Sequence, residues 1–154
     1  MDEIEEIKKL KARYFRGLDS KDWALYESCF AEDIVVDLTR AGGEKFDGRD
    51  AFMAYATAMP MVQSVHNGHM PEIELTGPDS AAGVWALEDY NIWEDGTQNH
   101  GWGHYLETYV KRDGRWQIRT MALSYLRIDR PGEQAVLVAG AEGTKHLHGF
   151  RPAG

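Results

Sequence analysis

The spacing of apolar residues changes near residue 61, and this change constrains the fold of the chain more than any other feature. Before it the pattern predicts helices, and after it four long strands over residues 63–75, 81–93, 101–112 and 115–127. The turn sequences "GPDS", "EDGTQ" and "RDG" separate these segments, as in an antiparallel meander. Helices followed by hairpin-linked strands are typical of an α+β domain in which helices pack on one face of a curved antiparallel sheet. The concave side of that sheet would hold a pocket.

Three helices are expected in the first sixty residues. The first carries an apolar stripe at steps of three and four: Ile4, Ile7, Leu10, Tyr14 and Leu18. The second is expected over "DSKDWALYESCF", with Asp19 or Ser20 capping its start. The third opens with Asp47 in a capping position and stops at Pro60. Between the second and third helices, "DIVVDLT" predicts a strand and "EKFDG" a brief return strand.

Length and charge limit the class of partner. At 154 residues the chain can bury one core, and we expect one domain over residues 1–127 followed by a glycine-rich tail over residues 128–154. The net charge of −8 and the lack of a basic stripe argue against nucleic acid or an anionic membrane as a partner, so a small molecule is expected. One cysteine, no signal-peptide pattern and no long apolar run indicate a cytoplasmic protein.

A carboxylate falls among apolar residues in the segment that starts at residue 81. Because strand side chains alternate, one face carries five residues: Trp85, Leu87, Asp89, Asn91 and Trp93. A carboxylate is costly to hold on an apolar face unless a charged or hydrogen-bonding group pairs with it. Asp89 is therefore expected to have a partner.

Two histidines stand three residues apart in "SVHNGHMPEIEL". In a regular strand His66 and His69 point to opposite faces, so only one of them can face the pocket. That argues against a shared metal site, which needs three or four converging ligands. On its own, a strand histidine is more often a hydrogen-bonded core or surface residue than a catalyst.

Structural roles also explain the other candidates. Tyr14 could be a core tyrosine, and Asp19 a helix cap. Sheet packing or subunit contacts would account for four aromatic residues of the strands: Trp85, Trp93, Trp102 and Tyr105. His146 and His148 fit exposed tail residues. What favours a site is the combination of one helix tyrosine, one strand histidine and one strand carboxylate that can all face one interior.

Four segments of the chain resemble a known family: "IKKLKARYFRGLDSKDW", "HNGHMPEI", "WALEDYNIW" and "DGRW". They are similar to the SnoaL-like branch of the NTF2-like superfamily, the cone-shaped α+β fold of scytalone dehydratase, ketosteroid isomerase and several polyketide cyclases. The bacterial bile acid 7α-dehydratases are the nearest likeness, and the resemblance extends from Ile4 to about Arg127. The last strand is about two residues longer than that of the family.

The resemblance implies four catalytic residues: Tyr14, Asp19, His66 and Asp89. His66 would be the base, with Asp89 as its paired carboxylate and His69 as a bystander. Asp19 would position Tyr14 or a substrate hydroxyl. Three further residues are predicted to contact the substrate: Trp85, Tyr105 and Arg127.

These assignments predict a cofactor-independent dehydratase that acts on a hydroxylated cyclic carbonyl compound of steroid or polyketide type, with no metal or nucleotide. A histidine titrates near physiological pH, where a proton acceptor works best. The proton removed lies next to a carbonyl, so negative charge flows to an oxygen that Tyr14 can stabilise. An isomerase or cyclase would use the same residues, and a non-catalytic binding protein or accessory subunit is the third alternative.

A homo-oligomer is also expected, because the outer sheet face carries apolar side chains that water would disfavour: Val84, Ala86, Tyr90 and Ile92. The resemblance favours a trimer over a dimer.

Overall fold

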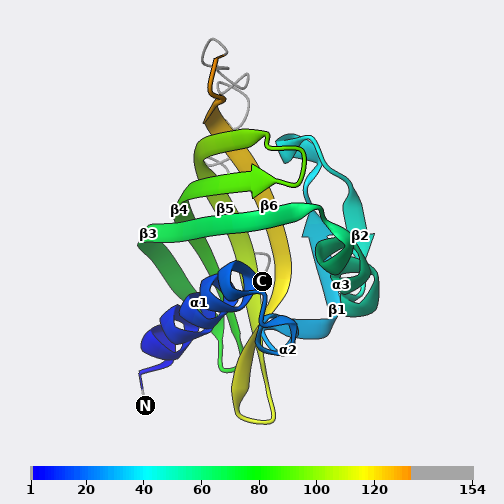
Figure 1. The fold of residues 1–154 in the computed structure, drawn as a ribbon. Coiled ribbons are helices and arrows are strands. Elements are labelled where there is room, and N and C mark those ends of the chain that lie inside the picture. The colour runs from blue at the N-terminus through cyan, green and yellow to red at the C-terminus, as the bar shows by residue number, and fades with distance from the viewer. Residues whose placement is uncertain (1, 133–154) are drawn as a thin grey trace.

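The computed structural model describes residues 2–132 and has the predicted division into helices first and long strands afterwards (Figure 1). The helices are α1 (Glu3–Ser20), α2 (Trp23–Glu27) and α3 (Arg49–Ala58), with a short 3₁₀ turn over Thr39–Ala41. The strands are β1 (Phe30–Asp37), β2 (Lys45–Asp47), β3 (Met61–Gly77), β4 (Ser80–Trp93), β5 (Gln98–Arg112) and β6 (Arg115–Asp129). The α+β class is confirmed.

All six strands form one curved sheet in the order β2-β1-β6-β5-β4-β3. The predicted antiparallel meander of β3 to β6 is confirmed. The sheet is mixed rather than wholly antiparallel, however, because β1 pairs with β6 in parallel. A parallel pair needs a long crossover, and here β2, α3 and the first three strands of the meander provide it. Figure 1 shows α1 lying across the concave side of the sheet and α3 beside β1 and β2.

Local capping sets the helix boundaries. The α1 prediction holds, and Asp2 accepts the backbone N–H of Ile4 at its start. The second helix is shorter than predicted: its cap is Asp22, neither Asp19 nor Ser20, and it ends before β1 begins at Phe30. Gly48 rather than Asp47 precedes α3, which ends two residues before Pro60.

Aromatic rings fill the space between the helices and the concave face. The Phe30 ring meets the Tyr26 ring edge-on at a centroid distance of 4.8 Å, and the Phe52 ring at 5.3 Å. Tyr14 joins this cluster from α1 with its ring 5.0 Å from that of Tyr26. Such edge-to-face pairs stabilise a core beyond their buried area. The cluster fixes the helix end of the cavity described below.

The predicted alternation along β4 is also observed. Trp85, Leu87, Asp89 and Asn91 are buried on the concave side, whereas Tyr90 is 43% exposed on the other. Asp89 therefore faces the interior, as its neighbours in the sequence indicated.

A tight helix crossing depends on Gly17. A Cβ atom at this position would lie 2.8 Å from the backbone nitrogen of Tyr26. Glycine in a helix is about 1 kcal/mol less favourable than alanine, so helix propensity alone predicts that Gly17→Ala stabilises the protein. We expect the opposite, a decrease of about 1–3 kcal/mol in the free energy of unfolding because of overpacking, measured by urea unfolding.

The control is Arg16→Ala, at an exposed position of the same helix, which should change the free energy of unfolding by under about 0.5 kcal/mol. A more stable Gly17→Ala protein would contradict the predicted clash.

Among residues 2–132, no helix is long and apolar enough to cross a membrane. The last strand runs to Asp129, two residues past the predicted end of the domain. Most of the predicted glycine-rich tail, with His146 and His148, lies outside the described residues.

Candidate active site

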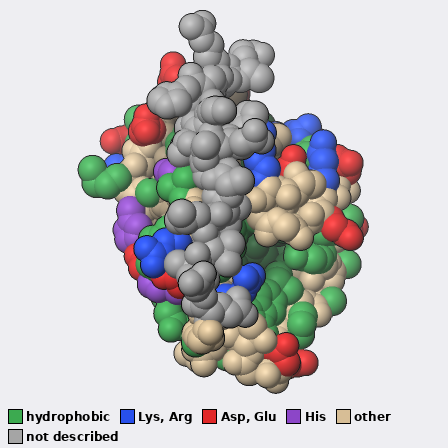
Figure 2. All heavy atoms as spheres, turned by 90° about the horizontal axis from the view of Figure 1, so that it is seen from above, with side chains coloured by type: hydrophobic (Ala, Val, Ile, Leu, Met, Phe, Trp, Pro, Cys, Tyr) green, Lys and Arg blue, Asp and Glu red, His purple; other side chains and the backbone are tan. Residues whose placement is uncertain are grey.

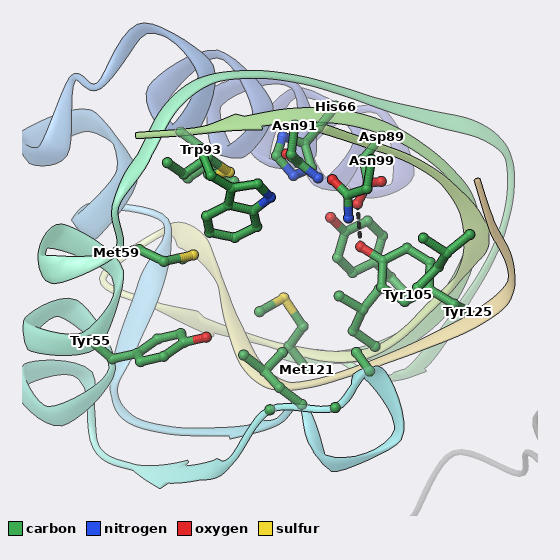
Figure 3. Close-up of a pocket in the computed structure, with 18 of the residues that line it drawn as sticks. Tyr55, Met59, His66, Asp89, Asn91, Trp93, Asn99, Tyr105, Met121 and Tyr125 are labelled. Atoms are coloured by element: carbon green, nitrogen blue, oxygen red, sulfur yellow. Dashed lines mark hydrogen bonds between the residues drawn. The ribbon is translucent and has the colours of Figure 1, made fainter. Parts of the chain in front are cut away.

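A cavity of about 290 Å³ lies between the helices and the concave face of the sheet. Four of the seven predicted site residues line it: Tyr14, His66, Asp89 and Tyr105. Figure 3 shows His66, Asp89, Asn99 and Tyr125 toward one side of this cavity, whereas Trp93, Met59, Met121 and Tyr55 lie toward the other.

His66 is held by the carboxylate of Asp19. Its Nδ1 lies 2.7 Å from Asp19 Oδ1, and its backbone N–H donates to Asp19 Oδ2 at 2.7 Å. The hydroxyl of Ser64 also donates to Asp19 Oδ1, at 2.8 Å. The end of α1 and the start of β3 are thus tied together by one carboxylate. Asp19 does not line the cavity but lies behind the histidine that does.

This contact sets the chemistry of the imidazole. When Nδ1 carries the proton that Asp19 accepts, Nε2 has a free lone pair and can accept a proton. No residue of the described range 2–132 forms a hydrogen bond with Nε2. The His66 side chain is only 8% exposed, and its ring stacks on Phe15 at 6.5 Å with 12° between the planes. The arrangement is that of a fixed, partly desolvated base.

The predicted pairing of His66 with Asp89 is wrong. The two residues are directly opposite in the β3–β4 register, but Asp89 Oδ2 accepts the hydroxyl of Tyr125. Asp19 reaches His66 from α1, and Tyr125 reaches Asp89 from β6. The other Asp89 oxygen, Oδ1, is buried without a donor among residues 2–132.

Three tyrosine hydroxyls meet at the helix end of the cavity. The Tyr14 hydroxyl is hydrogen-bonded with those of Tyr26 and Tyr105, and all three residues line the cavity. Burial raises the pKa of each of these phenols well above its ordinary value. The hydroxyls therefore stay protonated and can donate hydrogen bonds near neutral pH.

A fully buried ion pair supports the tyrosines. Lys11 Nζ lies 2.5 Å from Glu107 Oε1, and neither side chain is exposed. The same ammonium is 3.9 Å from the centroid of the Tyr14 ring and 3.5 Å from that of Tyr105. Cation–π contacts are strongest when desolvated, as they are here.

Trp85 belongs to this buried network and not to the cavity. Its Nε1 donates to the Tyr109 hydroxyl at 2.8 Å, and that hydroxyl donates to Glu107 Oε2 at 2.6 Å. Trp85 does not line the cavity, which corrects its predicted contact with the substrate.

Arg127 is also outside the cavity. Its guanidinium is half exposed, pairs with Asp129 at 2.7 Å and lies over the ring of Trp102. The β5–β6 register shifts by one residue between Tyr125 and Arg127. Tyr125 faces the cavity in regular alternation with Met121 and Leu123. The bulge follows Tyr125 and turns Arg127 outward.

His69 lies on the outer face, 52% exposed, with Nε2 at 3.5 Å from Glu88 Oε2. Of the two histidines of β3, His66 faces the interior and His69 does not, as the alternation of the strand indicated. No three His, Cys, Asp or Glu side chains converge within residues 2–132 in a way that could hold a metal ion.

Six polar or charged residues of the cavity were not identified from the sequence as site residues: Tyr26, Tyr55, Asn91, Asn99, Tyr125 and Arg130. Asn91 shares the face of Asp89, and this alternation could have identified it. Tyr125 is two residues from Leu123 and four from Met121, which also line the cavity, so the alternation of the last strand could have identified it as well.

The chain matches the family described as SnoaL-like domain over residues 1–122. A scytalone dehydratase-like protein from Novosphingobium aromaticivorans is similar in structure, with a TM-score of 0.75 and 20% identity over 87% of this chain and 91% of that one. The hexachlorocyclohexane dehydrochlorinase LinA-type3 from Novosphingobium barchaimii has a TM-score of 0.73 and 16% identity over 86% and 92% of the two chains. A protein of unknown function from Mycobacterium tuberculosis has a TM-score of 0.68 and 26% identity over 95% and 90%.

Proposed function

The chain belongs to the SnoaL-like domain family, and on this basis we propose that it is a cofactor-independent lyase. Its reaction is the elimination of water from a hydroxylated cyclic carbonyl compound of steroid or polyketide type. The observation that carries the proposal is the His66–Asp19 dyad, which places an imidazole nitrogen at the wall of a cavity that also holds tyrosine hydroxyls. The structural neighbours cited above with 16% and 20% identity support the fold alone.

The dyad would take up the proton and return it. Nε2 of His66 removes a proton from the carbon next to the carbonyl, and Asp19 stabilises the imidazolium that forms. The electron pair of the broken C–H bond forms the new double bond as the hydroxyl on the neighbouring carbon leaves. The imidazolium gives its proton to that hydroxyl, so water departs and His66 is neutral again. No electrons are gained or lost overall.

The tyrosines would stabilise the charge that develops on the carbonyl oxygen. Tyr14 and Tyr105 both line the cavity, and burial keeps both phenols protonated by raising their pKa values. A preorganised donor in a site shielded from water acts mainly on the transition state.

Mass spectrometry of the full chain incubated with a panel of β-hydroxy ketones tests the reaction. The panel includes hydroxylated 3-oxo-steroids and smaller cyclic compounds. Loss of one water molecule from a substrate is expected. Rearrangement at constant mass would instead indicate an isomerase or cyclase, and binding without chemical change would indicate a carrier.

Tyr14→Phe is expected to lower kcat by about 10²–10³-fold, the usual effect of removing one donor to a developing oxyanion. Steady-state kinetics with a substrate found in the panel give the value. Tyr90→Phe removes a hydroxyl from the exposed outer face and should leave kcat unchanged. If Tyr14→Phe matched Tyr90→Phe, the donor role of Tyr14 would be excluded.

We also propose that the protein is a homotrimer that associates through the outer face of the sheet. The partly exposed apolar side chains of β4 support this: Val84, Ala86, Tyr90 and Ile92. Sedimentation velocity measures the mass in solution, and a monomer or dimer would contradict the trimer.

A further inference from the structure

One wall of the cavity carries hydrogen-bond acceptors that the described part of the chain leaves without donors. The Oδ1 atoms of Asp89, Asn91 and Asn99 are buried, and no donor among residues 2–132 reaches them. All three residues line the cavity, and Figure 3 shows Asp89 and Asn99 close together on one side of it. Buried acceptors in folded proteins nearly always have partners. Three acceptors without donors on one wall indicate a partner that residues 2–132 do not supply.

The strand register brings these groups together. Asn91 on β4 is directly opposite Asn99 on β5, and Asp89 is opposite Gly101. Opposed side chains on one face lie about 4.5–5.5 Å apart at Cβ, so one ligand hydroxyl can reach both amides. A Cβ atom at Gly101 would lie 2.6 Å from Asp89 Oδ1 and 2.5 Å from Tyr125 Cε1. Glycine at this position therefore leaves room for the carboxylate.

The carboxylate determines the kind of group that can bind. Asp89 Oδ2 already accepts the Tyr125 hydroxyl, so Oδ1 is the oxygen that remains. An asparagine amide can turn by 180° and present either its accepting oxygen or its donating nitrogen to a ligand. An unprotonated carboxylate oxygen can only accept a hydrogen bond. The complementary ligand group is a hydroxyl or another hydrogen-bond donor.

The rest of the cavity limits the ligand to a small and partly apolar compound. Trp93, Met59 and Met121 line its other sides (Figure 3). The volume of about 290 Å³ is at the lower end of the roughly 300–1,000 Å³ that small-molecule sites span. One or two rings fit this volume better than four.

We propose that the ligand is a one- or two-ring compound with at least two hydroxyl groups. One hydroxyl donates to Asp89 Oδ1, and a second donates to the pair formed by Asn91 and Asn99. The inference rests on the proposed function in taking this ligand to be the substrate. It narrows that proposal toward polyhydroxylated ring compounds and away from steroids with a single hydroxyl.

Calorimetric titration with three matched probes tests the donor requirement: 1,3-dihydroxynaphthalene, 1-naphthol and 1,3-dimethoxynaphthalene. The diether keeps the oxygen atoms and the rings but has no donor. The diol is expected to bind about tenfold or more tightly than the diether, with 1-naphthol between them. Equal affinities, a preference for the diether or no binding of any probe would overturn the inference.

Variants of the protein show which residues cause the preference for the diol. In the double variant Asn91→Leu with Asn99→Leu, the preference for the diol over 1-naphthol is expected to disappear, because the second hydroxyl loses its acceptors. Asn67→Leu, at an exposed position on β3, should bind all three probes like the unmodified protein. Circular dichroism checks the fold of each variant. The comparison of diol and diether on the unmodified protein decides the question even if the double variant fails to fold.

Failure of this inference can be distinguished from failure of the proposed function, because the probes do not undergo the proposed elimination. A diol preference without loss of water from any β-hydroxy ketone would keep the binding site and exclude the lyase. Loss of water without a donor preference would keep the lyase and exclude this ligand class.

Discussion

The His66→Gln variant is expected to lose about 10²–10⁴-fold in kcat, the usual contribution of a general base. Glutamine is close to histidine in size but cannot take up a proton at neutral pH. Its amide still reaches toward Asp19, which keeps the backbone contact at 2.7 Å. Stopped assays of water loss, with the substrate found in the panel, measure the change.

A matched control is available three residues away. His69→Gln removes a histidine from the same strand at an exposed position on the outer face, and its kcat should equal that of the unmodified protein. If both variants kept the kcat of the unmodified protein, His66 would be excluded as the base and with it the proposed mechanism. An equal loss in both would indicate damage to β3 rather than a catalytic role.

The Lys11→Met variant is expected to lower the free energy of unfolding by about 3–5 kcal/mol, because it leaves the Glu107 carboxylate buried without its counter-ion. Burial lowers the pKa of the Lys11 ammonium, and the charge of Glu107 opposes that shift. Neither side chain is exposed, so water cannot replace the missing partner. Denaturant unfolding followed by circular dichroism measures the loss.

The double variant Lys11→Met with Glu107→Gln tests whether the unpaired charge or the changed packing causes the loss of stability. With both charges removed no uncompensated ion remains, and most of the lost stability should return. The amide oxygen of the introduced glutamine can still accept the hydroxyl of Tyr109, which donates to Glu107 in the unmodified protein. If the double variant were as unstable as Lys11→Met alone, packing rather than the unpaired charge would explain the loss.

The fold could be predicted from the sequence because its signals are local. The change of apolar spacing near residue 61 and the three turn sequences determined the order of elements and the meander. The parallel pairing of β1 with β6 could not be predicted, since it joins segments that are far apart in the chain. Strand alternation correctly placed Asp89 inside and separated the two histidines.

The contacts of the site residues were harder to predict, because they depend on how elements cross. Asp19 was expected to act on Tyr14 or the substrate, but the end of α1 meets β3 and brings the carboxylate to His66. For Lys11, the sequence did contain evidence of a buried charge. It lies four residues after Ile7 and three before Tyr14, on the buried stripe of α1. A charged residue at such a position indicates a buried partner, although the sequence does not reveal that the partner is Glu107.

Figure 2 shows acidic and basic side chains on both sides of the face in view and histidine side chains on its left side. No single basic stripe stands out on this face.

Hydrogen exchange at the His66 backbone amide can be used to follow the contact between His66 and Asp19, because this amide donates a hydrogen bond to the Asp19 carboxylate. Strand β3 is at the end of the sheet order, where outward-facing amides lack a neighbouring strand and usually exchange quickly with water. The His66 amide is covered by Asp19 Oδ2 at 2.7 Å instead. Its exchange rate should therefore follow the docking of α1 on β3, so one amide signal reports when the contact between His66 and Asp19 forms, with no substrate present.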